Sequence, residues 1–98
     1  MRSTRSKMLL GFNHNIKFRG KTYHIQTEDG GRSNPIIKTH IFIGGVILDS
    51  VQVSYEDIVG RPAWRDVLKN RMKAQHLDEI CRLVSGGVVV DNDQPDGP

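Results

Sequence analysis

The chain has little cysteine, few aromatic residues and no long hydrophobic run. Cys81 is its only cysteine, which excludes an internal disulfide and a zinc site built on several cysteines. No stretch is long and apolar enough to cross a membrane. The basic start leads only into the short apolar run 8–10, which is too short for a signal peptide. We therefore expect a cytoplasmic protein without membrane insertion.

The length of 98 residues fits one small domain. Hydrophobic residues make up 37% and charged residues 26%, so the expected core is small, and self-association as a homodimer would enlarge it. The predicted organisation is a flexible basic arm over residues 1–10, a single domain over 11–87 and a disordered acidic tail over 88–98.

The net charge of +3 is unevenly spread. Residues 1–27 contain six basic residues and no acidic one, whereas the tail carries Asp91, Asp93 and Asp96. This distribution suits an acidic protein or a nucleic acid as partner, or is ordinary solvated charge.

Residues 12–31, FNHNIKFRGKTYHIQTEDGG, predict a β-hairpin with one buried face. A type II′ turn takes glycine first, which favours a turn at Gly20-Lys21. The cross-strand pairs expected on the largely apolar face are Phe18 with Tyr23, Ile16 with Ile25, and His14 with Thr27. The opposite, polar face carries Asn13, Asn15, Lys17, Arg19, Thr22, His24, Gln26 and Glu28.

A second hairpin is predicted from IIKTHIFI, a Gly44-Gly45 turn and VILDSVQVSYEDI. The cross-strand pairs expected from this turn are Ile43 with Val46, Ile41 with Leu48, and His40 with Asp49. The run 41–48 is apolar apart from its glycines, which is typical of strands covered on both faces. The helix would cover one face and another subunit the other.

A helix is predicted from Pro62 to about Ser85, where Gly86-Gly87 ends it. It shows two apolar stripes about half a turn apart, the first made of Trp64, Val67, Leu68 and Met72 and the second of Leu77, Ile80, Cys81 and Val84. Either the helix bends near residues 73–75, or its C-terminal half packs on something else. The predicted fold class is α+β, with a four-stranded, mainly antiparallel sheet of two β-hairpins followed by one long C-terminal helix.

No metal ion, cofactor or catalytic residue is expected. His14 and His24 point to opposite faces of the hairpin and so cannot share a metal ion. Structural roles are expected instead for His14 at the core edge and for His40 held by Asp49. Cys81 has no positioned base, and no phosphate-binding glycine motif or nucleophile elbow occurs. We therefore do not expect an enzyme.

The polar face of the first hairpin is the candidate surface for binding another protein. Asparagine is a poor strand former, so two of them in FNHN suggest a use. That use is contact with a partner or capping of a neighbouring loop, including TEDGG. The candidate partner-binding residues are Asn13, Asn15, Lys17, His24, Gln26 and Glu28.

Nucleic-acid binding is the alternative function. Its candidate residues are Arg2 and Arg5 on the arm and Arg61, Arg65, Lys69 and Lys73 at four-residue intervals. The latter row would span about 18 Å along a helix, enough to follow a phosphate backbone. Aromatic residues for base stacking are few, and an ordinary solvated helix face is the competing interpretation.

Three runs resemble a group of short, largely uncharacterised bacterial proteins, chiefly deltaproteobacterial. The runs are GFNHNIKFRGKTYHIQTEDGG, NPIIKTHIFIGGVILDS and SYEDI. Their pattern is Phe-Asn-His-Asn, His-x-Gln-Thr-Glu-Asp, Thr-His-x-Phe-x-Gly-Gly and Ser-Tyr-x-Asp-Ile, followed by a helix with Gln75-His76. The similarity covers residues 11–85. It implies no catalytic activity or cofactor, and an adaptor role in bacterial signalling or motility.

Overall fold

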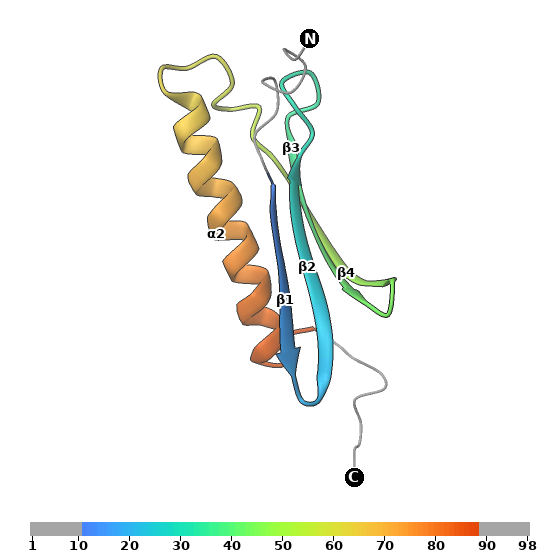
Figure 1. The fold of residues 1–98 in the computed structure, drawn as a ribbon. Helices are drawn as coiled ribbons and strands as arrows, with labels where there is room; N and C mark the ends of the chain where they lie inside the picture. Colours follow the sequence, from blue (N-terminus) through green and yellow to red (C-terminus); the bar gives the residue numbers. More distant parts are fainter. Residues whose placement is uncertain (1–10, 89–98) are drawn as a thin grey trace.

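The computed structural model describes residues 11–88, which form a four-stranded sheet with one helix packed on it (Figure 1). The strands lie in chain order, and every neighbouring pair is antiparallel. The elements are β1 Phe12–Phe18, β2 Lys21–Asp29, β3 Ile36–Ile43, β4 Val46–Ser54 and α2 Trp64–Val84. The predicted α+β fold is confirmed.

The predicted arm and most of the predicted tail, residues 1–10 and 89–98, lie outside the described residues. Val88, which the sequence assigns to the tail, is buried beside Tyr23 and Leu83. The packed domain therefore extends through Val88.

The turn between β1 and β2 differs from the prediction. Arg19 and Gly20 both have positive φ, 54° and 78°, as in a type I′ turn, which matches the twist of paired strands. Ile16 therefore lies opposite Tyr23 rather than Ile25, so the predicted Gly20-Lys21 turn and its pairs are wrong. The predicted register of β1 on β2 is displaced by two residues. Because side chains alternate between the faces of a sheet with a period of two, each residue still lies on the expected face.

The second hairpin has the predicted turn. Gly44 and Gly45 have φ values of 56° and 81°, which an L-residue with a side chain rarely adopts. Ile43 lies opposite Val46, as the sequence indicates.

Beyond this turn a β-bulge changes the register. Leu48 is the extra residue on β4, so Ile41 lies opposite Asp49, and His40 lies opposite Ser50. The predicted pairs of Ile41 with Leu48 and of His40 with Asp49 are therefore wrong. A bulge leaves one residue unpaired and moves each later residue of its strand by one position along the partner.

Helix α2 covers one face of the sheet over β1, β2 and β3, and it reaches β4 through the side chain of Arg82, which binds Asp49. The apolar core between them contains Tyr23, Ile25, Ile37, Ile41, Tyr55, Ile58, Leu68, Met72, Leu83 and Val88. β4 lies at the side of the sheet away from α2 (Figure 1), and Ile47 on it is exposed. The single chain thus leaves the second face of the sheet without cover in its described part.

The helix packs on the sheet along its whole length. Its buried stripe starts with Leu68 and Met72 and continues through two polar residues, His76 and Glu79, to Leu83. The C-terminal half therefore packs on the same sheet as the N-terminal half. The second apolar stripe of the sequence lies mainly in solvent, where Leu77, Cys81 and Val84 are exposed.

The start of α2 is strained, which gives a test of the helix boundary. Ala63 is the N-cap residue, with φ 58° and no side-chain cap bond. Glycine adopts this left-handed conformation without the clash of a Cβ atom. We expect Ala63→Gly to raise the free energy of unfolding by about 1 kcal/mol in urea denaturation. Inside the helix, at Ala74, the same substitution should lower it by about 1 kcal/mol; a loss at both positions would contradict the boundary.

Candidate functional site

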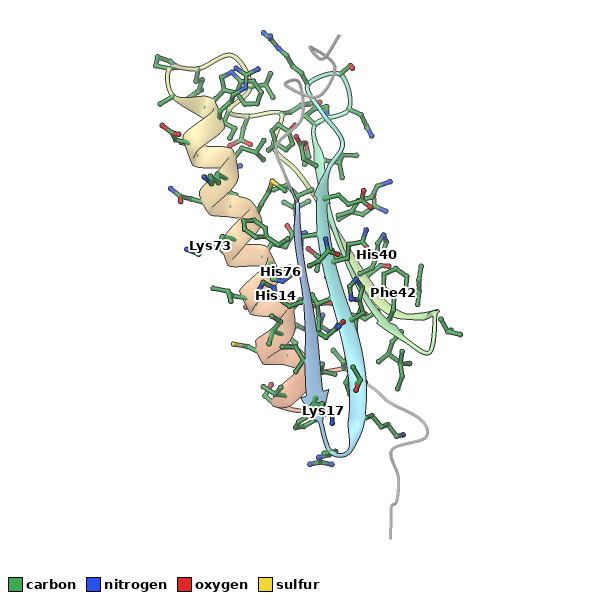
Figure 2. The ribbon with its side chains drawn as sticks, viewed as in Figure 1. His14, Lys17, His40, Phe42, Lys73 and His76 are labelled. Atoms are coloured by element: carbon green, nitrogen blue, oxygen red, sulfur yellow. The ribbon has the colours of Figure 1, made fainter. Side chains whose placement is uncertain are left out.

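The face of the sheet opposite α2, called the open face below, gathers all six predicted partner-binding residues. Asn13, Asn15 and Lys17 of β1 alternate with His14 and Ile16, which face the helix side. The same alternation on β2 puts His24, Gln26 and Glu28 on the open face. Figure 2 shows His40 and Phe42 of β3 pointing away from the helix as well.

His24 is held by two asparagines of the neighbouring strand. Its Nδ1 lies 2.8 Å from the side-chain oxygen of Asn15, directly opposite. Its Nε2 lies 3.1 Å from the side-chain oxygen of Asn13. A neutral imidazole has one N–H, so in that state one of the two amides turns its NH₂ group to the ring. The asparagines of FNHN thus fix the orientation of this imidazole.

Phe42 lies between two imidazoles on the open face. Its ring centre is 6.0 Å from that of His24 and 5.7 Å from that of His40. The Nδ1 of His40 in turn lies 2.7 Å from the hydroxyl oxygen of Ser50. The expected bond of His40 to Asp49 is wrong, because the bulge puts Ser50 opposite the histidine. The result is a row of rings across β2 and β3.

Sequence analysis missed the contribution of β3 and β4 to this surface. The alternation of Lys38, His40 and Phe42 was available as a signal, but the neighbouring isoleucines obscured it. Ser50 could be placed only with the bulge known. On the first hairpin, Gln26 donates its amide to Glu28 over 3.5 Å, a weak contact at the surface.

The loop TEDGG is capped from within. Asp29 is buried, and its Oδ1 accepts the backbone N–H of Gly31 at 2.9 Å and the hydroxyl of Tyr55 at 2.5 Å. Burial, followed by the bond to Asp29, raises the pKa of Tyr55 far above its usual value. The asparagines of the open face therefore do not cap this loop and bond to His24 instead.

A polar network joins α2 to the sheet on the other face. The buried His76 bonds through Nδ1 to the hydroxyl of Thr27 at 2.8 Å and through Nε2 to Nδ1 of His14 at 2.8 Å. Thr27 also shares a 2.7 Å hydrogen bond with Thr39, which accepts the amide of Gln75 at 3.0 Å. Burial, followed by the nearby His14, lowers the pKa of His76. His14 thus has the structural role that the sequence predicts.

A second polar cluster links α2 to β4. Arg82 donates to Glu79 at 2.7 Å and to Asp49 at 2.9 Å. Burial, followed by a hydrogen bond to Asp49, raises the pKa of Glu79 to about 7. The hydrogen bond from Glu79, with the charge of Arg82, lowers the pKa of Asp49.

The predicted nucleic-acid residues do not all lie on the helix. Arg61 precedes α2, in a turn where its N–H donates to Ile58. Arg65, Lys69 and Lys73 follow one exposed flank of α2, and Figure 2 shows Lys73 on the side away from the sheet. Arg2 and Arg5 lie outside the described residues. Residues 11–88 contain no group of three or more His, Cys, Asp or Glu side chains that could hold a metal ion.

No protein-family model, curated protein or solved structure matches this chain. The resemblance to short bacterial proteins therefore stays a prediction. Within residues 11–88, none of the helical structure has the length and hydrophobicity of a transmembrane segment.

The network around Thr27 predicts a large effect of removing one hydroxyl. Thr27→Val should lower the free energy of unfolding by about 1–3 kcal/mol, because it leaves buried polar partners on Thr39 and His76 unsatisfied. Thr22 lies on the same strand but is exposed on the open face, and Thr22→Val should change stability by less than about 0.5 kcal/mol. Urea denaturation of both variants is the measurement, and equal effects would contradict the network.

The raised pKa of Glu79 predicts a pH dependence. Because the pKa rises from 4.5 to about 7 on folding, the folded state binds this proton more tightly than the unfolded chain. The stability contributed by Glu79 therefore falls as the pH rises from about 4.5 to about 7. Glu79→Gln should remove this loss, seen as a flatter decline of Tm between about pH 4.5 and about pH 7.

Two comparisons isolate the Glu79 effect. His76 acts in the opposite direction, because its lowered pKa makes its contribution to stability decrease as the pH falls through 6.5. The Glu79 contribution is therefore the difference between the variant and wild-type curves. Glu56→Gln, at an exposed glutamate, should leave the curve unchanged. A Glu79→Gln curve parallel to wild type would show that Glu79 titrates normally.

Proposed function

We propose that this protein is a non-catalytic binding domain that contacts another protein through the open face. The observation that supports this most directly is the row formed by His24, Phe42 and His40. Interface centres are enriched in aromatic side chains and are surrounded by polar groups. Asn13, Asn15 and Ser50 provide such a polar surround and hold the imidazoles in place.

Pre-orientation favours binding by this face. A side chain that already has a fixed rotamer loses less entropy when a partner covers it. His24 has both ring nitrogens engaged, and His40 has one. At His24 these bonds occupy both ring nitrogens that proton transfer would use, which supports binding rather than catalysis by this residue. The sequence resemblance suggests the specific form of this proposal, an adaptor in a bacterial signalling or motility system.

Nucleic-acid binding is the alternative, and the observed geometry gives it less support. The basic residues of α2 lie away from the open face, which itself combines Lys17 and Lys38 with Glu28. Trp64 is the aromatic residue nearest the basic flank, but Arg65 lies 4.8 Å over its ring and Tyr55 stacks on it at 6.2 Å. These contacts cover the ring that a base would need for stacking.

A triple substitution tests the proposal. Asn15, His24 and Gln26 are replaced with alanine, and capture from a bacterial lysate is compared with that of the wild-type chain. We expect a specific protein to be retained at least tenfold less by the variant. The melting temperature should change little, because surface contacts of this kind contribute about 0.5 kcal/mol or less each.

A matched triple variant of the basic residues at the start of the helix provides the control. Arg61, Arg65 and Lys69 replaced with alanine should leave protein capture unchanged. Nucleic acid retained by the wild type, stripped by added salt and lost in this helix variant would instead support the alternative, because phosphate binding is strongly salt-dependent. A drop of several degrees in the melting temperature of the open-face variant would show that those side chains are structural.

A further inference from the structure

The outer side of α2 has the spacing of a coiled-coil seam. Six residues follow one another in alternating steps of three and four, and all are exposed: Val67, Asn70, Ala74, Leu77, Cys81 and Val84. Alternating steps of three and four place these residues on one stripe, as positions a and d of a heptad repeat. The sheet does not use this stripe, since Leu68 on the buried side is nine residues, or half a turn, from Leu77.

The exposure of this seam is unusual for its composition. Leu77 is 51% exposed and Val84 is 43% exposed, although both lie on a well-formed helix whose other side is fully packed. The small Ala74 and Cys81 lie on either side of Leu77 in the seam and allow another helix to approach closely. Asn70 is the single strongly polar residue in the seam, and such a residue commonly fixes the register of paired helices.

The charges beside the seam identify what it fits. With Val67 at position a, Asp66 and Lys73 occupy position g, and Arg71 and Asp78 occupy position e. In a parallel pair of helices, a residue at position g faces the residue at position e that comes five residues later in the other helix. Asp66 would then face Arg71 of the second copy, and Lys73 would face Asp78 of the second copy. Both pairs have opposite charges, and twofold symmetry forms each of them twice.

Three of these four flanking side chains are free to make such pairs, and Arg71 would exchange its own Asp57 for Asp66 of the second copy. Within residues 11–88, Asp66, Lys73 and Asp78 make no hydrogen bond or ion pair, while Arg71 binds Asp57 at 2.9 Å with its side chain 38% exposed. An antiparallel arrangement of the same stripe places Lys73 beside Ile80 and Arg71 beside Asp78 of the second copy, so it forms two opposite-charge pairs where the parallel arrangement forms four. The charges therefore favour the parallel orientation of two copies.

We propose that two copies of this chain pair in parallel through the outer side of α2. Leu77 and Val84 lie against their own counterparts across the twofold axis, and the two sheets lie on the outside of the dimer. The open faces then point away from each other. This proposal is independent of what the open face binds, but a dimer would present two such faces and bind a bivalent partner more tightly.

Cys81 makes the arrangement directly measurable on the unmodified chain. In the parallel dimer the two Cys81 side chains lie at the same height, between helix axes about 8–10 Å apart. A short bis-maleimide should therefore join them and give a covalent dimer in high yield. In the antiparallel arrangement Cys81 lies opposite Asn70, and the two sulfurs are separated by about 16 Å along the axis.

Two variants of equal exposure separate this interface from the free edge strand β4. Leu77→Asp should weaken dimerisation at least tenfold in sedimentation equilibrium and abolish the cross-link. Its thermal melt, measured at a concentration where the wild type is monomeric, should be unchanged, because Leu77 lies in solvent in the monomer. Ile47→Asp changes a residue on β4 that is 53% exposed and should leave dimerisation unchanged.

Charge reversal tests the orientation. Lys73→Glu should weaken dimerisation several-fold, and adding Asp78→Lys should restore it, because the pair is re-formed with its signs exchanged. A chain that stays monomeric at high micromolar concentration would overturn the proposal. So would a dimer lost with Ile47→Asp but kept with Leu77→Asp, or a dimer that gives no Cys81 cross-link.

Discussion

The hydrogen bond between Thr27 and His76 fixes how α2 lies on the sheet. Most of the contact between helix and sheet is apolar and has no direction of its own, so many rotations of the helix would bury similar area. The buried imidazole removes this freedom, because both its nitrogens must find partners away from water. With His76 turned to Thr27 and His14, the Leu77 side of the helix must face outward.

The same layer contains two titratable groups with opposite effects on stability. Burial disfavours the charged form of both, because it lowers the pKa of His76 and raises the pKa of Glu79 to about 7. Lowering the pH therefore reduces the stability contributed by His76, whereas raising the pH reduces the stability contributed by Glu79. Both groups lie on one helix, a single turn apart, and just below pH 6.5 their contributions to stability change in opposite directions.

Much of the fold could be predicted because it depends on short-range patterns. The alternation in β1 and β2 assigned Asn15 and His24 to one face although the turn itself was misplaced. The bulge at Leu48 could not be predicted, since its position depends on how β4 fits β3 and not on the local sequence. The buried stripe of α2 was missed at His76 and Glu79. Polar residues can be buried on a helix when other parts of the fold supply their hydrogen-bond partners, and the apolar spacing of the sequence does not show where this happens.

The sequence by itself determined four strands, one helix and the polar residues of the first hairpin, since side-chain alternation and helical spacing arise between near neighbours in the chain. Only the tertiary structure decided that Phe42 and His40 join His24 on one surface, and that Leu77 and Val84 face solvent. These arrangements depend on strand register and helix rotation. Both are set by contacts between residues far apart in the chain, here Ser50 with His40 and Thr27 with His76.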